Sequence, residues 1–192
     1  MSALRLINET SASSSASVSA TDIFSEDFDI YKIVIDDIDQ TSTGGFINQT
    51  RFINSSGSII TSANYDNALL QLKSYGSFGE VRATNQTKMD LMNVITGGAE
   101  VGQGTVIYVF NPYNSSSYTF AICQSQQFYA GAGGFGTKSI GVLKQTSSIT
   151  GINFLPSGNS YDNFKFRLIG SWLGNKLIPV ILDVCFNTPI DK

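Results

Sequence analysis

Apolar and polar residues alternate with a period of two along most of this sequence. In residues 164–168 apolar and charged side chains alternate strictly, and residues 31–35 follow the same pattern with the odd-numbered positions inward. Residues 118–123 repeat it, with a row of small residues expected to face outward and the larger even-numbered residues inward. Such alternation is typical of a strand in an antiparallel sheet that buries one face and exposes the other.

Further strands are predicted where β-branched and aromatic residues cluster, at 4–7, 45–53, 89–95, 105–110, 139–144 and 149–154. The near-continuous apolar run at 105–110 predicts a central strand that is covered on both sides. Clusters of Gly, Pro, Asn and Ser separate these segments, most clearly at 54–57, 97–98, 111–112, 156–159 and 174–175. Many short strands joined by regular turns predict an all-β sandwich or barrel.

Two segments depart from the strand pattern. Residues 66–73 contain good helix formers, an acidic start and Gly76 placed to end a helix, so a short helix and a surface loop are equally open there. Residues 10–21, TSASSSASVSAT, have the composition of a flexible linker. Their small side chains also suit an edge strand or a tight wrap along a sheet, which is the interpretation we favour.

Composition and charge exclude several classes of function. Charged residues make up only 14% of the 192 residues, the net charge is −3 and the pI is about 4.8. No basic patch is available to neutralise phosphates, so no nucleic-acid partner is expected. No apolar run approaches the roughly 20 residues that span a bilayer, and the start MSALRLINET lacks the apolar region of a signal peptide. We therefore expect no membrane insertion and synthesis in the cytoplasm.

The absence of histidine removes much catalytic and metal chemistry. Without His the chain cannot build a Ser–His–Asp or Cys–His centre or an imidazole metal site. The two cysteines, Cys123 and Cys185, are too few for a metal cluster and are expected to be buried, reduced thiols, although one disulfide stays open. No catalytic residue, cofactor or metal is predicted, and the chain is expected not to be an enzyme.

A glycine-rich motif and two acidic clusters resemble ligand-binding motifs but lack residues that those motifs require. Residues 131–136, GAGGFG, match the spacing of a dinucleotide-binding loop, but the next residues have a strand pattern where that site needs a helix. We expect a glycine-rich loop joining two strands. Acidic residues cluster at 26–29 and 36–39 without the Gly and distal Glu of a calcium loop. A glycosidase-type carboxylate pair stays open, but solvated strand ends are favoured.

Aromatic residues near turns are candidates for contact with sugars. Four rings fall at or near predicted turns: Tyr113, Tyr129, Phe135 and Tyr161. Exposed rings at such positions can stack on glycans. The alternative, which we favour, is that these rings cap the ends of the sandwich core.

Several segments, taken in order, resemble one family. The start LRLINETSASSSASVSATDIFSEDFDIYKIVI at 4–35 combines a Leu-Ile pair, a Ser/Ala/Thr run and an aromatic corner in which Phe28 replaces the usual first Tyr and Tyr31 is the second. GGAEVGQGTVIYVFNPYNSSSYTF at 97–120 and SSITGINFLPSGNSYDNFKFRLIG at 147–170 follow. Together they resemble the small β-sandwich modules of tailed-bacteriophage virion proteins that are frequent in marine and cyanobacterial phages.

The resemblance implies a jelly-roll-like antiparallel β-sandwich carried on tail fibres, spikes or the capsid surface, with no catalytic residues. It covers most of residues 4–170, so we expect a sandwich domain at 1–170 and a C-terminal extension or arm at 171–192. The extension is apolar and is expected to cover a surface of its own chain or of a neighbouring subunit. Its candidate subunit-contact residues are Trp172, Leu177, Ile178, Ile181 and Phe186.

These observations predict a non-enzymatic virion structural protein, a β-sandwich displayed on the tail, fibre or capsid that contributes to host attachment through a surface glycan. Its expected partners are other virion proteins and further copies of itself, such as in a homotrimer. Two alternatives are a capsid decoration protein with no receptor role and a freestanding carbohydrate-binding module. A glycan-degrading enzyme that uses a carboxylate pair is the third.

Overall fold

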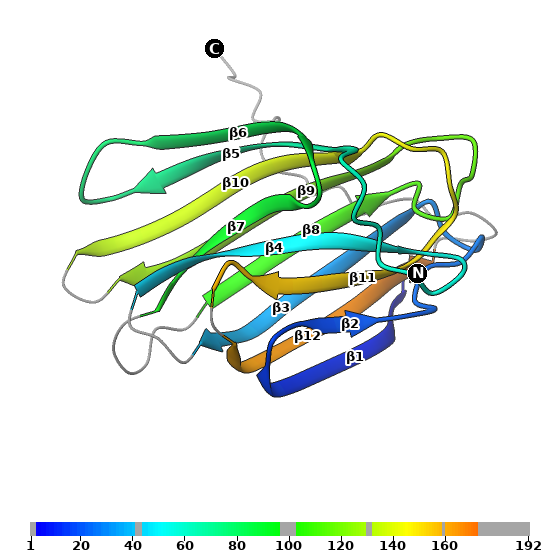
Figure 1. Cartoon of the computed structure of the whole chain (residues 1–192). Helices are drawn as coiled ribbons and strands as arrows, with labels where there is room; N and C mark the ends of the chain where they lie inside the picture. Colours follow the sequence, from blue (N-terminus) through cyan, green and yellow to red (C-terminus); the bar gives the residue numbers. More distant parts are fainter. Residues whose placement is uncertain (1–2, 41–43, 97–102, 130–131, 159, 173–192) are drawn as a thin grey trace, which may run out of the picture.

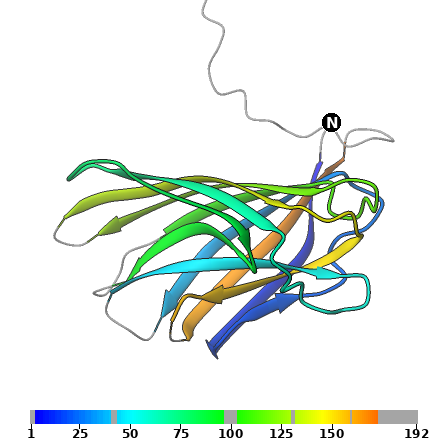
Figure 2. The same ribbon diagram turned by 45° about the horizontal axis from the view of Figure 1, so that its top comes forward.

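A computed structural model describes residues 3–40, 44–96, 103–129, 132–158 and 160–172, and these residues form two antiparallel sheets with no helix. The larger sheet contains, in spatial order, β1 (Ala3–Ser15), β12 (Tyr161–Trp172), β3 (Ile30–Gln40), β8 (Gln103–Phe110), β9 (Thr119–Tyr129), β10 (Gly133–Leu143), β5 (Tyr65–Lys73) and β6 (Gly79–Gln86). The smaller sheet contains β2 (Val18–Ala20), β11 (Ile149–Pro156), β4 (Gly44–Asn54) and β7 (Met89–Thr96). The two sheets pack face to face (Figures 1 and 2), so the predicted antiparallel β-sandwich is confirmed.

The strand order is that of a jelly roll with two additions. When the β5–β6 and β9–β10 hairpins are set aside, the sheets read β1-β12-β3-β8 and β2-β11-β4-β7. If the eight remaining strands are renumbered 1 to 8 along the chain, these orders become 1-8-3-6 and 2-7-4-5. This is the arrangement of two interlocked Greek keys. The two hairpins pair with each other through β10 and β5 and with the jelly roll through β8 and β9. They therefore widen the larger sheet beyond the eight-stranded jelly roll (Figure 1).

Alternation along β3 and β12 fills the core as predicted. Tyr31, Ile33 and Ile35 on β3 are buried, and so are the three alternate apolar residues of β12, Phe164, Phe166 and Leu168. The intervening residues on both strands face outward. Phe154 of β11 crosses from the smaller sheet and packs against Phe164 and Phe166, with ring centroids 5.3 and 5.5 Å apart.

The aromatic corner before β3 closes one end of the sandwich. The Tyr31 hydroxyl donates to the Ser25 carbonyl at 3.0 Å and accepts from the Ser25 N–H at 2.8 Å. The rings of Phe24 and Phe28 pack edge-on against Tyr31. Burial raises the pKa of the Tyr31 phenol, so the hydroxyl stays protonated and can donate at neutral pH.

The Ser/Ala-rich segment forms edge strands, as expected. Its first part belongs to β1, which pairs with β12 at one edge of the larger sheet, and its last part is β2, which pairs with β11 at one edge of the smaller sheet. β12 continues to Trp172, which pairs with Ala3, so the last strand ends two residues beyond the expected domain boundary.

The sequence was misleading in the segment 66–73, where neither a helix nor a surface loop forms. All of it belongs to β5, which pairs with β10 on one side and β6 on the other. Burial alternates along it, with Asn67 and Leu69 inward and Ala68 and Leu70 outward. Pairing with two neighbouring strands outweighs the weak helical preference of these residues, because helix propensity differs by less than about 1 kcal/mol per residue.

The expected facing of residues 118–123 is also wrong. Thr119, Ala121 and Cys123 are buried, whereas Phe120 and Ile122 face outward and are 44% and 41% exposed. The reason is the close approach of β7 to β9 and to the middle of β10, which favours small side chains on the inner face there. The glycine-rich segment GAGGFG at 131–136 also differs from the expected loop. Strand β10 begins at Gly133, so most of this segment belongs to the strand.

One buried tyrosine offers a test of the packing between β4 and β5. The Tyr65 hydroxyl donates to the Ile60 carbonyl at 3.1 Å and accepts from the Phe52 N–H at 3.0 Å. Replacing it by Phe leaves two buried backbone groups without this partner, and each such loss costs about 1–3 kcal/mol. We expect Tyr65→Phe to lower the free energy of unfolding by about 2 kcal/mol or more in urea titrations. A loss below about 0.5 kcal/mol would show that water replaces the hydroxyl.

Candidate functional site

The outward side of β8, β9, β10, β5 and β6, here called the outer face, carries large apolar side chains where a sandwich usually exposes polar ones. Strand register aligns them in rows. Tyr108, Ile122 and Ile140 lie opposite one another on β8, β9 and β10, and Phe110, Phe120 and Val142 form the next row. Ile140 is 60% exposed.

The inner side of β9 and of the middle of β10 is mostly small and polar where it contacts the backbone of β7, the edge strand of the smaller sheet. Ser139 Oγ donates to the Leu91 carbonyl at 2.5 Å, and Gln127 Nε2 donates to the Asn93 carbonyl at 2.9 Å. These bonds satisfy carbonyls that an edge strand would otherwise leave without a partner. The polar residues are therefore needed inside, and the apolar residues of β9 and β10 are left on the outer face.

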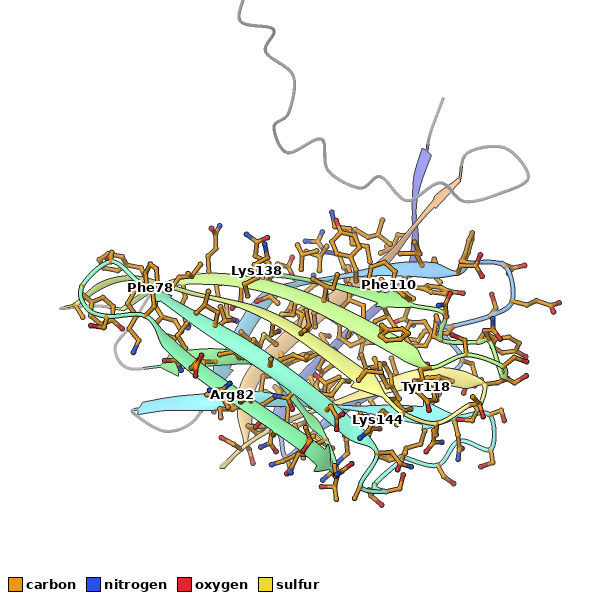
Figure 3. The ribbon with its side chains drawn as sticks, turned by 90° about the horizontal axis from the view of Figure 1, so that it is seen from above. Phe78, Arg82, Phe110, Tyr118, Lys138 and Lys144 are labelled. Atoms are coloured by element: carbon orange, nitrogen blue, oxygen red, sulfur yellow. The ribbon has the colours of Figure 1, made fainter. Side chains whose placement is uncertain are left out.

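A hollow lies in this face, with a volume of about 790 Å³. We call it the outer groove, and its lining includes Asp66, Ala68, Arg82, Phe110, Phe120, Ile122, Ile140 and Val142. The small Ala68 on β5 lies between the larger Ile140 and Arg82 in the strand register, which accounts for the depression. Figure 3 shows this side of the sheet, with Arg82 and Phe110 among its labelled residues.

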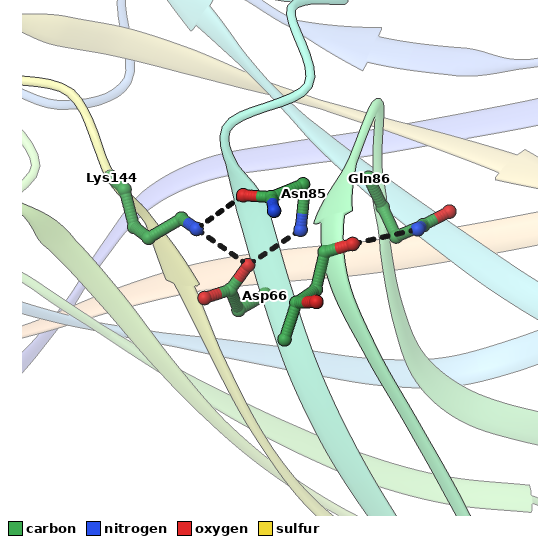
Figure 4. Close-up of polar contacts among 5 residues, drawn as sticks. Asp66, Asn85, Gln86 and Lys144 are labelled. Carbon is green, nitrogen blue, oxygen red and sulfur yellow. Dashed lines mark hydrogen bonds and ion pairs between the residues drawn. The ribbon is translucent and has the colours of Figure 1, made fainter.

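A polar cluster closes one end of the outer groove. Lys144 Nζ lies 2.9 Å from Asp66 Oδ1 and donates to Asn85 Oδ1 at 2.7 Å (Figure 4). The Asn85 N–H also donates to Asp66 Oδ1, at 2.7 Å. The Lys144 ammonium, together with this N–H, lowers the pKa of Asp66. The cluster joins β5, the end of β6 and the segment after β10, so it fixes the rim of the groove.

The opposite end of the outer face carries a second apolar group, here called the tip, which consists of Leu72, Tyr75, Phe78 and Phe128. Phe78 is 68% and Phe128 57% exposed. Phe128 lies opposite Gly134 in the register, so no side chain on β10 covers it. In Figure 3 Phe78 lies far from Phe110 and Tyr118, which mark the other end of the sheet.

The four aromatic residues proposed for glycan contact do not share a surface. Tyr161 is fully buried, its ring centroid lies 4.7 Å from that of Phe164, and its hydroxyl donates to Asn48 Oδ1 at 3.1 Å, so it belongs to the core. Phe135 is also buried, on β10. Tyr113 is exposed in the turn after β8, and Tyr129 is the last residue of β9. Tyr161 and Phe135 are therefore inaccessible to a glycan. Contact between Tyr113 and a glycan stays a prediction.

The predicted subunit-contact residues fall at the end of the described chain. Trp172 is the last residue of β12. The other four, Leu177, Ile178, Ile181 and Phe186, lie outside the described residues. The aromatic and aliphatic residues of the outer face and the tip were not predicted as contact residues.

No reactive centre is evident in the described part of the chain. Cys123 is a free, buried thiol whose pKa burial raises to about 12, so it is a poor nucleophile. One acidic cluster ends at Asp29, just before β3, and the other begins at Asp36 within β3, seven residues further along the strand. Even the nearest members of the two clusters are thus about 23 Å apart, beyond the spacing of a glycosidase pair. Among the described residues no group of three or more Cys, Asp or Glu side chains could hold a metal ion, and no helix could cross a membrane.

Comparisons with known proteins add little. No family model and no curated protein matches the sequence. A fructofuranosidase from Schwanniomyces occidentalis, solved as the E230A form with fructosylnystose, aligns over 86% of this chain and 34% of its own with 5% identity and a TM-score of 0.20. The CspB protease of Clostridium perfringens aligns over 81% and 25%, with 13% identity and a TM-score of 0.15. The chain thus spans about a third of one protein and a quarter of the other, and neither similarity carries an argument about fold or function.

Proposed function

We propose that this protein is a non-enzymatic structural subunit of a tailed-phage virion, a jelly-roll module that assembles with copies of itself and with other virion proteins on the tail, fibre or capsid surface. The observation that carries the assembly part of this proposal is the apolar tip, where Phe78 and Phe128 remain more than half exposed. Large apolar groups grouped on a surface are typical of sites that contact another protein.

The energetics favour contact at the tip. Burying one such side chain fully stabilises an association by about 1.5–3 kcal/mol before ordering costs. The main tip residues belong to a strand or to the short turn between β5 and β6, so little backbone needs to be ordered on binding. Low charge in the sequence is consistent with a subunit whose surface is covered by neighbours in a symmetric assembly such as a trimer.

The virion context rests on the sequence resemblance, because a jelly roll by itself hosts many functions. A role in attachment to a host glycan is a second element of the proposal, and it rests on Tyr113 and the neighbouring Tyr118, both exposed beside the β8–β9 turn. If the protein decorates the capsid without binding a receptor, these two rings have no ligand. Binding to a panel of host envelope polysaccharides, with Tyr113→Ser as the comparison, separates the two roles.

The assembly proposal is tested with a double variant, Phe78→Ser and Phe128→Ser. We expect the unmodified protein to run as a homo-oligomer in size-exclusion chromatography with light scattering, and the variant to shift to monomer with the same unfolding temperature. A matched control, Ile59→Ser and Tyr118→Ser, removes two apolar side chains of 40% and 44% exposure away from the tip and should leave the oligomer intact.

Immunogold labelling of particles of the phage that encodes the chain then locates the subunit. Decoration of the tail or of the head decides between the two positions. A monomeric protein that is absent from purified particles would overturn the proposal.

A further inference from the structure

The outer groove is an apolar hollow whose contents the described residues do not supply. Phe120, Ile122 and Ile140 each expose between 41% and 60% of their surface there. The groove is at the opposite end of the outer face from the tip. An occupant of the groove is therefore independent of assembly through the tip.

The described chain stops beside this groove. Ile169 of β12 pairs with Lys32 of β3, and Ile30, two residues earlier on β3, pairs with Phe110 of β8. If the antiparallel register continues for two residues, Ser171 lies in line with Ile30 and Phe110. The row that starts with Phe110 continues through Phe120 and Val142 across the groove. β12 therefore ends level with the row of Phe110, Phe120 and Val142, which lines the groove.

The length of chain that follows is sufficient to reach the groove. From β12 the sheet order to β10 is β3, β8, β9 and β10, which is four steps, and one further step reaches β5. With strands about 4.8 Å apart, these distances are about 19 and 24 Å. Residues 173–179, when extended, span about 23–25 Å. Residues from 180 onward can thus lie over the groove without any change in the sandwich.

The sequence of this segment suits such a position. In VILDVCF at 180–186, the even-numbered residues are Val180, Leu182, Val184 and Phe186, all apolar. The odd-numbered positions include Asp183. An extended segment would therefore present one wholly apolar side and place the only charge on the other.

We propose that residues 180–186 of the chain's own C-terminal segment fill the outer groove as an extended strap, with Val180, Leu182, Val184 and Phe186 facing Phe120, Ile122 and Ile140. The tether favours the same chain over a second copy, because a short link holds the segment near its site at an effective concentration in the millimolar range. This inference does not depend on the proposed function, because it concerns the other end of the outer face.

Cysteine cross-linking tests the contact. The variant carries Ile140→Cys, Val184→Cys and Cys185→Ser, and Cys123 stays silent because it is buried and its thiol pKa is raised to about 12. After mild oxidation, we expect peptide mapping to find a disulfide between positions 140 and 184, and non-reducing electrophoresis to show a monomer. The control places Ser56→Cys, in the exposed turn after β4, instead of Ile140→Cys and should give no such product.

Deleting residues 175–192 gives an independent measurement. We expect the truncated protein to stay folded and to bind the dye ANS several-fold more than the full chain, and Ile140→Lys to abolish this increase. Disulfides formed between chains would identify a second copy as the occupant and overturn the proposal. It is also overturned if no disulfide forms, or if the full chain binds as much ANS as the truncated chain. If truncation unfolds the protein, the cross-linking result alone decides.

Discussion

Phe154→Ala is expected to lower the free energy of unfolding by about 3–5 kcal/mol. Phe154 is fully buried and is the main ring of the smaller sheet that contacts the aromatic cluster of β12. Its removal leaves a cavity between the two sheets that the surrounding strands cannot close, since Phe164 and Phe166 are held in place by pairing on both sides of β12. A loss of this size is a large fraction of the total stability of a typical domain.

Urea titration followed by far-ultraviolet circular dichroism measures this loss. The slope of the free energy of unfolding against urea concentration should be the same for the variant and the unmodified protein. Tyr118→Ala is a suitable control because it also removes an aromatic ring, but one that is 44% exposed. We expect its effect to stay within about 0.5 kcal/mol. Similar losses for both variants would contradict the packing of β11 against β12 described above.

The sequence was informative wherever one side of a strand is polar and the other apolar. The alternation on β3 and β12 predicts both the strands and their inward residues, because charged side chains at Lys165 and Arg167 leave only one possible facing. Edge strands in the Ser/Ala-rich segment were also predicted, because small residues suit a strand that has one neighbour. These are cases in which local pattern and tertiary packing agree.

The sequence failed where tertiary contacts reverse the usual facing. On β9 the two sets of alternate residues are both mixed, so apolarity pointed to Phe120 and Ile122 as core residues. The deciding factor is the backbone of β7, which accepts hydrogen bonds from Gln127 and Ser139 and requires small neighbours. Gln127 and Ser139 are far from β7 in the sequence, and nothing in the spacing indicates that they share a surface with Leu91. The outer face and its groove could not be predicted for this reason.

The inserted hairpins show the same limit in another form. Residues 66–73 carry helix-forming side chains, and their strand character comes from neighbours on β10 and β6 that are distant in the chain. Only the alternation of Asn67 and Leu69 with Ala68 and Leu70 could have indicated a strand. This signal is weak because Asn67 faces inward, where its amide donates to the Asp90 carbonyl of β7. A polar residue inside the sandwich breaks the apolar alternation by which strands are recognised.

The close approach of β7 to β10 leads to the second large effect, that of Gly141→Val. A Cβ atom at Gly141 would lie 2.5 Å from Met89 Sδ and 3.0 Å from Leu91 Cδ2, and both of these side chains are fully buried. Because both side chains are packed in the core, Met89 at least must shift, and the substitution strains the contact between β7 and β10 that includes the Ser139–Leu91 hydrogen bond. We expect a loss of about 1–3 kcal/mol or more in the free energy of unfolding, measured by urea titration.

Gly104→Val is the matched control, because Gly104 lies on β8 in the same sheet but faces outward. A Cβ atom there would meet only the Gln126 side chain, at 3.8 Å, which is an ordinary contact. Since valine favours strands and glycine weakens them, this variant should be as stable as the unmodified protein or slightly more stable. If Gly141→Val is tolerated equally well, β7 does not pack closely under β10. The small inner residues of β9 and β10 would then need another explanation, and so would the apolar outer face.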